Sequence, residues 1–342
     1  MRFPSRRTLL AASLVLGLGA PLVQAGETPT KVNALNFIRA ETDQYFAKTV
    51  REGGFGRLLH DREPTPQDKQ TVVRMNRDTL YSSGVFDLDA GPVTLSLPDA
   101  GQRFMSMQVF SQDHYVTDVT YTPGPHTYNR DQVGTRYVYV IVRTLANPED
   151  QNDIRAAQKL QDAISVRQAG KGQYEPAHWD SASQDKVRDA LNTLSALGGD
   201  GVRFGTREQV NPIAHLLGTA TGWGGNPEYA AKYVSVYPQR NDGHTVHRLR
   251  VRDVPVDGFW SISVYNGAGY FEKNGPGAVS LNNLTARKDA NGVVTVQFGG
   301  CEPSTANCLA VTPGWNYVVR LYRPRAEILD GRWTFPAAKS QL

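Results

Sequence analysis

Cysteine is nearly absent from this chain of 342 residues, which carries only Cys301 and Cys308. Long apolar runs are scarce as well: beyond residue 25, no stretch approaches the roughly 20 consecutive apolar residues of a transmembrane helix. The Gly-x-Ser-x-Gly elbow of α/β-hydrolases, the Walker phosphate loop and the Gly-x-Gly-x-x-Gly dinucleotide fingerprint are also missing. These absences argue against a membrane-embedded protein, a serine hydrolase of that fold and a nucleotide enzyme, and we predict no cofactor.

A large net charge is absent too, once the N-terminus is set aside. Residues 1–25, MRFPSRRTLLAASLVLGLGAPLVQA, have a basic start, a short apolar run and small residues at the end, the pattern of an export signal cut after Ala25. Its removal takes away Arg2, Arg6 and Arg7 and no acid, so the formal net charge falls from +4 to +1. No basic tail or RNA-binding aromatic motif remains, and we predict no nucleic-acid partner.

Export places the mature chain in the periplasm or outside the cell, by the general secretory route or, because of Ser5-Arg6-Arg7, by the twin-arginine route. In such an oxidising compartment Cys301 and Cys308, which share the short stretch GGCEPSTANCLAV, are expected to form a disulfide. The alternative, a pair of metal thiolates, lacks a second ligand pair at a suitable spacing. His244 and His247 should face opposite sides of a strand, so we predict no metal site.

Hydrophobic periodicity predicts an amphipathic helix over VNALNFIRAETDQYFAKTVREGG, followed by short β-rich runs from about Val72 to Arg143. The next segment has helical patterns: helices are expected after Asn147-Pro148, from Ser183 to Leu197, at NPIAHLLG and at NPEYAAKY. Strands return in HTVHRLRV, FWSISVY, VVTVQFG and NYVVRLYRP, and DANGVV contains an Asn-Gly turn that favours a hairpin.

These patterns predict an α+β fold that is mainly β, with two β-sandwich lobes joined by helices. The expected organisation is a signal peptide at 1–25, an N-terminal helix and β-rich lobe at 26–145, a helical bridge at 146–235 and a C-terminal β-lobe at 236–342.

Alternation sorts the side chains of two strands in the C-terminal lobe. The residues expected in the core are Trp260, Ile262, Val264, Tyr317, Val319 and Leu321. Those expected on the opposite faces are Ser261, Ser263, Tyr265, Asn316, Arg320 and Tyr322. Arg320 and Tyr322 then either line a cleft or pair with Glu327 and Asp330 on the surface. Trp333 and Phe335, in LDGRWTFP, are expected to pack against the end of the sheet.

Two long stretches carry a family resemblance. VRMNRDTLYSSGVFDLDAGPVTLSLPD resembles the core of the domain of unknown function 1254. GFWSISVYNGAGYFEKN, together with GWNYVVRLYRPRAEILDGRWTFP, resembles its usual C-terminal companion, the domain of unknown function 1214. The resemblance implies a bacterial exported or envelope protein with jelly-roll-like lobes. It implies no particular activity, because the hydrolase and carboxylesterase labels of some members are not justified by these motifs.

The stretch VRMNRDTLYSSG crowds hydrogen-bonding side chains just before a predicted strand. On an extended backbone Arg74, Asn76 and Asp78 point to one side, so Arg74 and Asp78 could pair across Asn76. One interpretation is structural: Asp78 caps a turn, Asn76 satisfies loop backbone groups and an arginine pairs with the carboxylate. The other is functional: Arg77 or Arg74 holds an anionic or polar ligand while Asp78 and Tyr81 transfer protons.

His114, in SQDHYVTD, is the candidate partner of Asp78 in proton transfer, because histidine titrates near physiological pH. The remaining predicted ligand contacts are Tyr81 and Trp223 as walls, and Tyr265, Arg320 and Tyr322 at a cleft between the lobes.

Two functions of different classes follow from these patterns. The first is a hydrolase-like or lyase-like enzyme, or a binder, that takes a small polar molecule or saccharide in a cleft between the lobes. The second is a non-catalytic envelope or assembly protein in which the VRMNRDTLYSSG network is scaffold. The first requires Arg77, Asp78 and His114 to converge on one open cavity, whereas the second leaves them buried and mutually satisfied.

Overall fold

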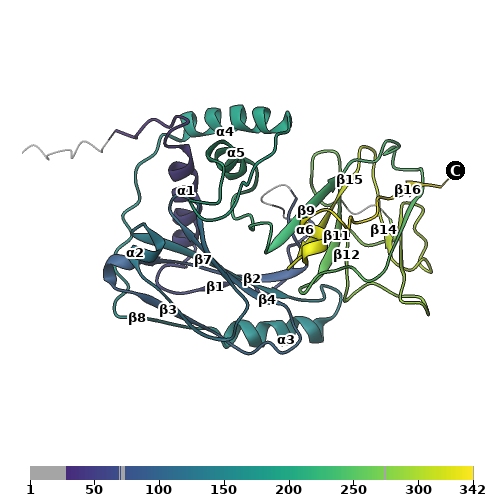
Figure 1. Ribbon diagram of the computed structural model, residues 1–342, viewed down its shortest axis with the longest axis horizontal. Helices are drawn as coiled ribbons and strands as arrows, with labels where there is room; N and C mark the ends of the chain where they lie inside the picture. The colour runs from purple at the N-terminus through teal and green to yellow at the C-terminus, as the bar shows by residue number, and fades with distance from the viewer. Residues whose placement is uncertain (1–27, 69, 71–73, 273–274, 342) are drawn as a thin grey trace, which may run out of the picture.

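The computed structural model describes residues 28–68, 70, 74–272 and 275–341, which form two β-rich lobes side by side (Figure 1). The fold is α+β and mainly β, as predicted: this part of the chain contains sixteen strands in four sheets and six α-helices. Within the same residues, no helix combines the length and apolar character needed to span a membrane. The predicted signal peptide lies outside the described residues.

The N-terminal lobe is a sandwich of two antiparallel sheets. The larger sheet has the order β1 (Leu59–His60), β2 (Thr79–Asp87), β7 (Tyr137–Leu145), β4 (Met105–Ser111), β5 (Val116–Thr120). The smaller has the order β6 (Gly124–Tyr128), β3 (Val93–Leu97), β8 (Ser165–Gln168). Met105, Met107 and Val109 enter the core between them, as alternation predicts. Ser106 and Gln108, on the other face of β4, are buried as well.

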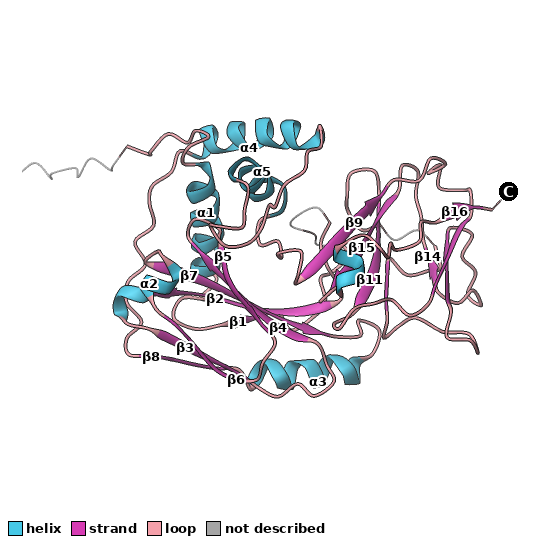
Figure 2. Ribbon diagram, viewed as in Figure 1, coloured by secondary structure: helices cyan, strands magenta, loops and turns pink. Residues whose placement is uncertain are grey.

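Helices cover the face of the larger sheet that points away from the smaller one (Figure 2). α1 (Phe37–Arg51) packs Phe46 against Val85 and Phe110 of that sheet, and α4 (Ser181–Ala196) and α5 (Pro212–Gly222) pack on α1. α3 (Gln151–Asp162) lies on the opposite face, beside the smaller sheet, and packs against β2 and β7 (Figure 2). The short helical turns are η1 (Leu88–Ala90), α2 (Arg130–Val133) and α6 (Ala326–Leu329).

Capping side chains fix where these helices begin. At α5 the side chain of Asn211 accepts hydrogen bonds from the amides of Ile213 and Ala214, and Pro212 occupies the first turn, as the Asn-Pro pair predicts. α3 begins later than Asn147-Pro148 suggests, because Asp150 is its cap and accepts from the amide of Asn152.

The C-terminal lobe is a second sandwich. One sheet has the order β14 (Cys308–Leu309), β13 (Val294–Phe298), β10 (His247–Val251), β16 (Lys339–Ser340). The other has the order β12 (Ser280–Asn282), β11 (Trp260–Tyr265), β15 (Asn316–Tyr322), β9 (Ala231–Val236). The six side chains predicted for this core all lie in it, and Phe335 joins them with Trp333 packed alongside.

The segment 146–235 is not a separate helical bridge. Its strand β8 pairs with β3 in the N-terminal lobe, and β9 pairs with β15 in the C-terminal lobe. NPEYAAKY does not form the expected helix, because the chain turns after Pro227 and enters β9 at Ala231. Pairing with a neighbouring strand here overrides the helical preference of the alanines.

The disulfide between Cys301 and Cys308 is present as predicted, with the two Cα atoms 5.6 Å apart. The nearby Asn-Gly turn also forms, with the amide of Gly292 donating to the carbonyl of Asp289. The hairpin expected there is wrong: the preceding strand of the described chain, β12, does not pair with β13, which pairs with β10 and β14 instead.

Replacing both cysteines with serine is expected to lower the free energy of unfolding by about 2 to 3 kcal/mol, because the bond closes only a short loop. Urea denaturation of the Cys301→Ser/Cys308→Ser protein beside wild type measures this. A change of under about 1 kcal/mol would show that the bond does not restrain the unfolded chain as the loop-entropy argument requires.

Candidate functional site

His114 lies in a turn after β4, with a backbone φ of +61°, and is fully buried. The amide of Gly224 donates to its Nε2 at 2.9 Å, so Nδ1 carries the proton and donates to Thr219 Oγ1 at 2.8 Å. Thr219 in turn donates to the carbonyl of His215, and the ring of Trp223 stacks on the imidazole. His114 therefore joins α5 to the sheet as a neutral imidazole with both nitrogens occupied.

Burial and the neighbouring His215 hold the pKa of His114 well below its usual value. Between the folded pKa and about 6.5, the unfolded chain therefore binds a proton that the folded chain does not. The resulting stability is present above about pH 6.5 and is lost as the pH falls through this window, by up to about 1.4 kcal/mol per pH unit.

The His114→Gln variant should accordingly lose less stability than wild type when the pH is lowered from about 7.5 to about 5.5. Urea denaturation of both proteins at several pH values gives the two slopes. The difference between the two slopes removes the contributions of other titrating groups, because both proteins share them. Equal slopes would contradict a buried neutral His114.

The structure does not bring Asp78 and His114 together. Asp78 immediately precedes β2, which begins opposite the Leu145 end of β7, whereas β4, which leads to His114, ends opposite Val138. These two ends of β7 are separated by roughly 20 Å at about 3.3 Å per residue. The two side chains therefore cannot act on one small molecule, and the convergence required for a shared proton-transfer site does not occur.

Asp78 is fully buried where the two lobes meet. Its amide donates to Asn76 Oδ1 at 2.9 Å, and its Oδ1 accepts from Asn282 Nδ2 of the second lobe at 3.2 Å. Its Oδ2 has no hydrogen-bond partner among the described residues. Burial raises the pKa of Asp78, and Arg320, Ser261 and Asn282 act in the opposite direction. Asp78 thus ties the start of β2 to the second lobe.

Arg320 of β15 is buried beside it and is enclosed by polar groups. Its guanidinium donates to Ser263 Oγ at 2.9 Å, to the carbonyl of Arg74 at 2.8 Å and to the hydroxyl of Tyr265 at 2.7 Å. Burial disfavours the cation, but two tyrosines and Asp78 outweigh this effect, and the pKa of Arg320 is raised. The expected surface pairing with Glu327 or Asp330 is wrong, because Arg320 faces the lobe junction.

Arg74 and Arg77 do not form the expected pair with Asp78. Arg74 has a φ of +55°, so the backbone is not extended there, and its guanidinium donates to Asn316 Oδ1 at 2.7 Å and to a tyrosine hydroxyl. Arg77 donates to the carbonyl of Thr65. Within the described chain, no ion pair joins either arginine to Asp78. Both arginines therefore serve loop and lobe contacts.

A second polar group surrounds Asn76, whose side chain is buried. Its Nδ2 lies 3.3 Å from the hydroxyls of Thr79 and Tyr81 and 3.2 Å from that of Tyr322. Since an amide NH₂ has only two hydrogens, these three hydroxyls share two donors. Across the described residues, no acceptor lies within reach of the O–H groups of Tyr81 and Tyr322. Both phenols therefore have a free proton to donate.

Arg143 of β7 stands beside this group. Only 5% exposed, it donates from Nη1 to Gln108 Oε1 at 2.5 Å and from Nη2 to the carbonyl of Gly224 at 3.0 Å. Its Cζ lies 5.7 Å from the ring centroid of Tyr81. No carboxylate of the described chain lies within 4 Å of it. A cation so deeply buried is rarely left without a countercharge.

Our sequence interpretation missed Arg143. The strand RYVYVIVR places it on the same face as Tyr137, Tyr139 and Ile141, all of which are buried. A charged residue on an otherwise apolar face of a central strand is unusual, and this is the feature of the sequence that points to Arg143.

Tyr233 of β9 closes the group from the second lobe. Its hydroxyl accepts from Asn226 Nδ2 at 2.7 Å, and its own proton has no acceptor among the residues that the structure describes. Tyr233 is 41% exposed, so the group reaches solvent here. Burial raises the pKa of Tyr322 most, and the neighbouring Tyr233 and Tyr81 raise it further. Arg320 and Arg143 lower it. The phenols and Arg143 therefore lie close enough to interact.

We call these five residues the Arg143 cluster: Asn76, Tyr81, Arg143, Tyr233 and Tyr322. The cluster has more hydrogen-bond donors than acceptors. Three phenol O–H groups have no acceptor in the described chain, and the guanidinium, with five donors, uses two in the bonds given above. Oxygen anions accept hydrogen bonds from such groups and supply the missing charge.

Two other predicted ligand contacts pack against protein: Trp223 is partly buried beside a core cluster, and Tyr265 is fully buried. Trp223 stacks on Tyr45 with ring centroids 4.2 Å apart and donates from Nε1 to Thr42. Tyr265 is 1% exposed and donates its hydroxyl proton to the carbonyl of Met75. Neither lines either of the two open cavities.

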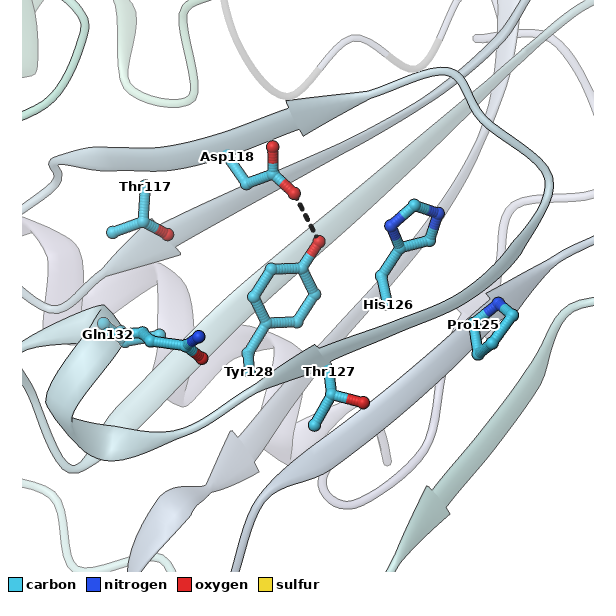
Figure 3. A pocket seen from close by; sticks show the side chains of 8 residues that line it. Thr117, Asp118, Pro125, His126, Thr127, Tyr128 and Gln132 are labelled. Atoms are coloured by element: carbon cyan, nitrogen blue, oxygen red, sulfur yellow. Dashed lines mark hydrogen bonds between the residues drawn. The ribbon is translucent and has the colours of Figure 1, made fainter.

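The described residues include two cavities that are open to solvent, and neither the predicted site residues nor the Arg143 cluster lines them. One, of about 520 Å³, lies between the lobes and is called the inter-lobe groove; Tyr121 and Leu145 line it from one lobe and Gly258 and Arg323 from the other. The second, of about 490 Å³, lies on the N-terminal lobe (Figure 3). There the hydroxyl of Tyr128 donates to Asp118 at 2.7 Å.

Each lobe contains a segment that matches a known protein family. The family DUF1254, a protein family of unknown function, matches residues 55–132, and DUF1214, also of unknown function, matches residues 229–326. The chain thus carries one segment that matches each of the two families. The two domains follow in the order expected from the sequence. No curated protein matches the chain.

Two solved structures resemble this chain. The VPA0106 protein from Vibrio parahaemolyticus is 18% identical, with a TM-score of 0.68 over 90% of this chain and 98% of that one. An uncharacterized protein from Burkholderia cenocepacia is 12% identical, with a TM-score of 0.50 over 85% of this chain and 84% of that one. At these identities the likeness concerns the fold alone.

Both matched domains contribute to the Arg143 cluster. The DUF1254 segment contains Asn76 and Tyr81, and the DUF1214 segment contains Tyr233 and Tyr322. Arg143 lies between the two segments in the sequence, on the central strand β7.

Proposed function

We propose that this protein binds a small organic anion between its lobes, at the Arg143 cluster. The observation that carries the proposal is the buried guanidinium of Arg143, which is grouped with three phenol donors and has no carboxylate of the described chain within 4 Å. An anionic ligand supplies the countercharge and the acceptors that the protein does not.

Other partly buried arginines of the chain support this interpretation. Arg103, Arg136 and Arg188 keep 19%, 28% and 23% of their side chains exposed, and each pairs with a carboxylate within 3.0 Å. The fold thus provides acids for these three arginines, which are better hydrated than Arg143. Arg320, which is also buried, has no carboxylate of the described chain within 4 Å, but its guanidinium is enclosed by four protein acceptors. Because burying an unpaired charge costs several kcal/mol, the retention of Arg143 at its position favours a binding role.

The charge of Arg143 also restricts the chemical class of the ligand. A neutral saccharide can accept hydrogen bonds from phenols, but it leaves the charge of Arg143 uncompensated. Proton transfer by Asp78 and His114 receives no support, because they lie at opposite ends of the sheet and His114 is fully occupied. We therefore propose binding of an anion in place of a hydrolase-like or lyase-like reaction.

The stretch VRMNRDTLYSSG then has two roles in this proposal. Arg74 and Asp78 join the lobes through Asn316 and Asn282. Tyr81 and the side chain of Asn76 belong to the Arg143 cluster. The scaffold and binding interpretations thus apply to different residues of one stretch.

We propose, further, that the protein acts after export. The N-terminal pattern and the disulfide support this location. The chain recovered from the periplasm should begin at Gly26, because Val23-Gln24-Ala25 fits the small-x-small rule. N-terminal sequencing that shows an uncut Met1, or a start elsewhere, would refute this cleavage.

Calorimetric titration with inorganic phosphate, acetate, benzoate and adipate tests the binding proposal. At least one probe should bind wild type with a Kd below about 1 mM. Tyr81→Phe keeps the ring but loses one hydrogen-bond donor to the anion. The loss should raise the Kd of that probe about 10-fold or more. Tyr270→Phe, a half-exposed tyrosine outside the cluster, is the matched control and should bind as wild type does. Absence of binding by all four probes would overturn the proposal.

A further inference from the structure

Arg323, which follows β15, lies at the inter-lobe groove without a countercharge from the described chain. Its Cζ lies 4.6 Å from the ring centroid of Tyr121, and both residues line the inter-lobe groove. Across the described residues, its guanidinium has neither a hydrogen bond nor an ion pair. It thus offers its full set of donors to the groove.

The backbone holds Arg323 in an uncommon conformation. Its φ is +50°, in the left-handed region that side-chain-bearing residues seldom adopt. Two hydrogen bonds of 2.8 Å secure it, from its amide to the carbonyl of Ala230 and from the amide of Asp257 to its own carbonyl. The guanidinium is therefore directed to its place over Tyr121 by a fixed loop.

The acids of the groove are occupied elsewhere. Asp153 pairs with Arg103, and Asp257 pairs with Arg325 at 2.7 Å. Asp99 accepts from the amide of Gly101. None of them lies within 4 Å of the Arg323 guanidinium. The groove therefore has a cation available for a ligand.

Strand register places Arg143 near this cation. Arg143 of β7 pairs with Ser106 of β4, and the next residue, Met107, pairs with Thr120 of β5, which immediately precedes Tyr121. Arg143 and Tyr121 therefore stand about two strand spacings apart, ~10 Å, at the same level of the sheet. Burial raises the pKa of Tyr121 to about 12, and Arg323 and Arg143 both oppose this rise. Tyr121 is therefore near both cations.

We infer that the anion bound at the Arg143 cluster carries a second acidic group, which Arg323 receives across Tyr121. The ligand class is a dicarboxylate, or a carboxylate with a second acidic group, whose two charges are separated by several bonds. A ligand of this kind contacts both lobes: β7 through one end and the loop after β15 through the other. This inference rests on the anion-binding function proposed above.

Titration with a matched pair of probes tests the second anchor. Hexanoate and adipate have chains of the same length and differ in the second carboxylate, so wild type should bind adipate at least about 10-fold more tightly. In Arg323→Met this ratio should fall to near one. Arg250→Met, which removes an exposed arginine on β10, is the matched control and should keep the wild-type ratio.

The outcomes separate the two claims. Binding of hexanoate and adipate with equal affinity by wild type would overturn the second anchor and leave anion binding intact. An adipate preference that survives in Arg323→Met would also overturn it, because another group would then hold the second carboxylate. Failure of wild type to bind either probe, or any of the other anions, would overturn both claims.

Discussion

The Asp78→Asn substitution is expected to lower the free energy of unfolding by about 3 to 5 kcal/mol. Asp78 and Arg320 are both buried at the lobe junction, and the charge of each acts on the other. No ion pair within 4 Å joins them, but an amide in place of the carboxylate removes the buried negative charge that acts on Arg320. Leaving a buried cation without its countercharge carries a cost of this size. Urea denaturation followed by circular dichroism measures it.

A double-mutant cycle shows whether the cost comes from this pair. Arg320→Met alone should also be strongly destabilising, because it leaves a buried carboxylate and removes three hydrogen bonds. Asp78→Asn with Arg320→Met should cost less than the sum of the two by about 2 kcal/mol or more. If Asp78→Asn alone costs under about 1 kcal/mol, the two charges are not coupled and the lobe junction is held by other contacts.

Arg143→Met is expected to have the opposite profile: it should weaken anion binding about 100-fold or more while leaving the fold largely intact. The binding loss follows because a desolvated, charge-assisted contact is worth about 2 to 5 kcal/mol. Stability should change by no more than about 2 kcal/mol. The variant loses hydrogen bonds to Gln108 and Gly224, but it also removes a buried charge that has no acid of the described chain within 4 Å.

The comparison of Arg143→Met with Arg320→Met separates a binding arginine from a structural one. Both replace a buried strand arginine with an apolar side chain of similar length, so the size of the cavity left behind is comparable. Equal destabilisation, above about 3 kcal/mol in both proteins, together with unchanged anion binding in Arg143→Met, would contradict the proposed role.

Alternation in the sequence predicted which side chains form the cores. Trp260 and Ile262 face inward, and Ser261 and Ser263 face the lobe junction, because period-two patterns are fixed by strand geometry alone. The pattern could not reveal what covers the second face. Ser261 is fully buried because the first lobe lies against it, and contacts between segments so far apart in the chain leave no local pattern.

The same limit explains the errors at VRMNRDTLYSSG. An extended backbone was assumed, but Arg74 has a positive φ and reaches Asn316, far along the chain. His114 was chosen for its chemistry, whereas its burial depends on α5, whose packing the sequence does not specify. Tyr81 and Tyr322 were both predicted as ligand contacts and lie together on Asn76. Arg143 does not stand out from the alternation of apolar residues, because that pattern carries no information about charge.

The most direct test of anion binding at the Arg143 cluster is a crystal structure of the wild-type protein grown with the tightest-binding probe. The account predicts the oxygens of the anion within about 3 Å of the Arg143 guanidinium and of at least one hydroxyl among Tyr81, Tyr233 and Tyr322. An anion bound at another place, with the Arg143 cluster filled by water or by a protein side chain, would contradict it.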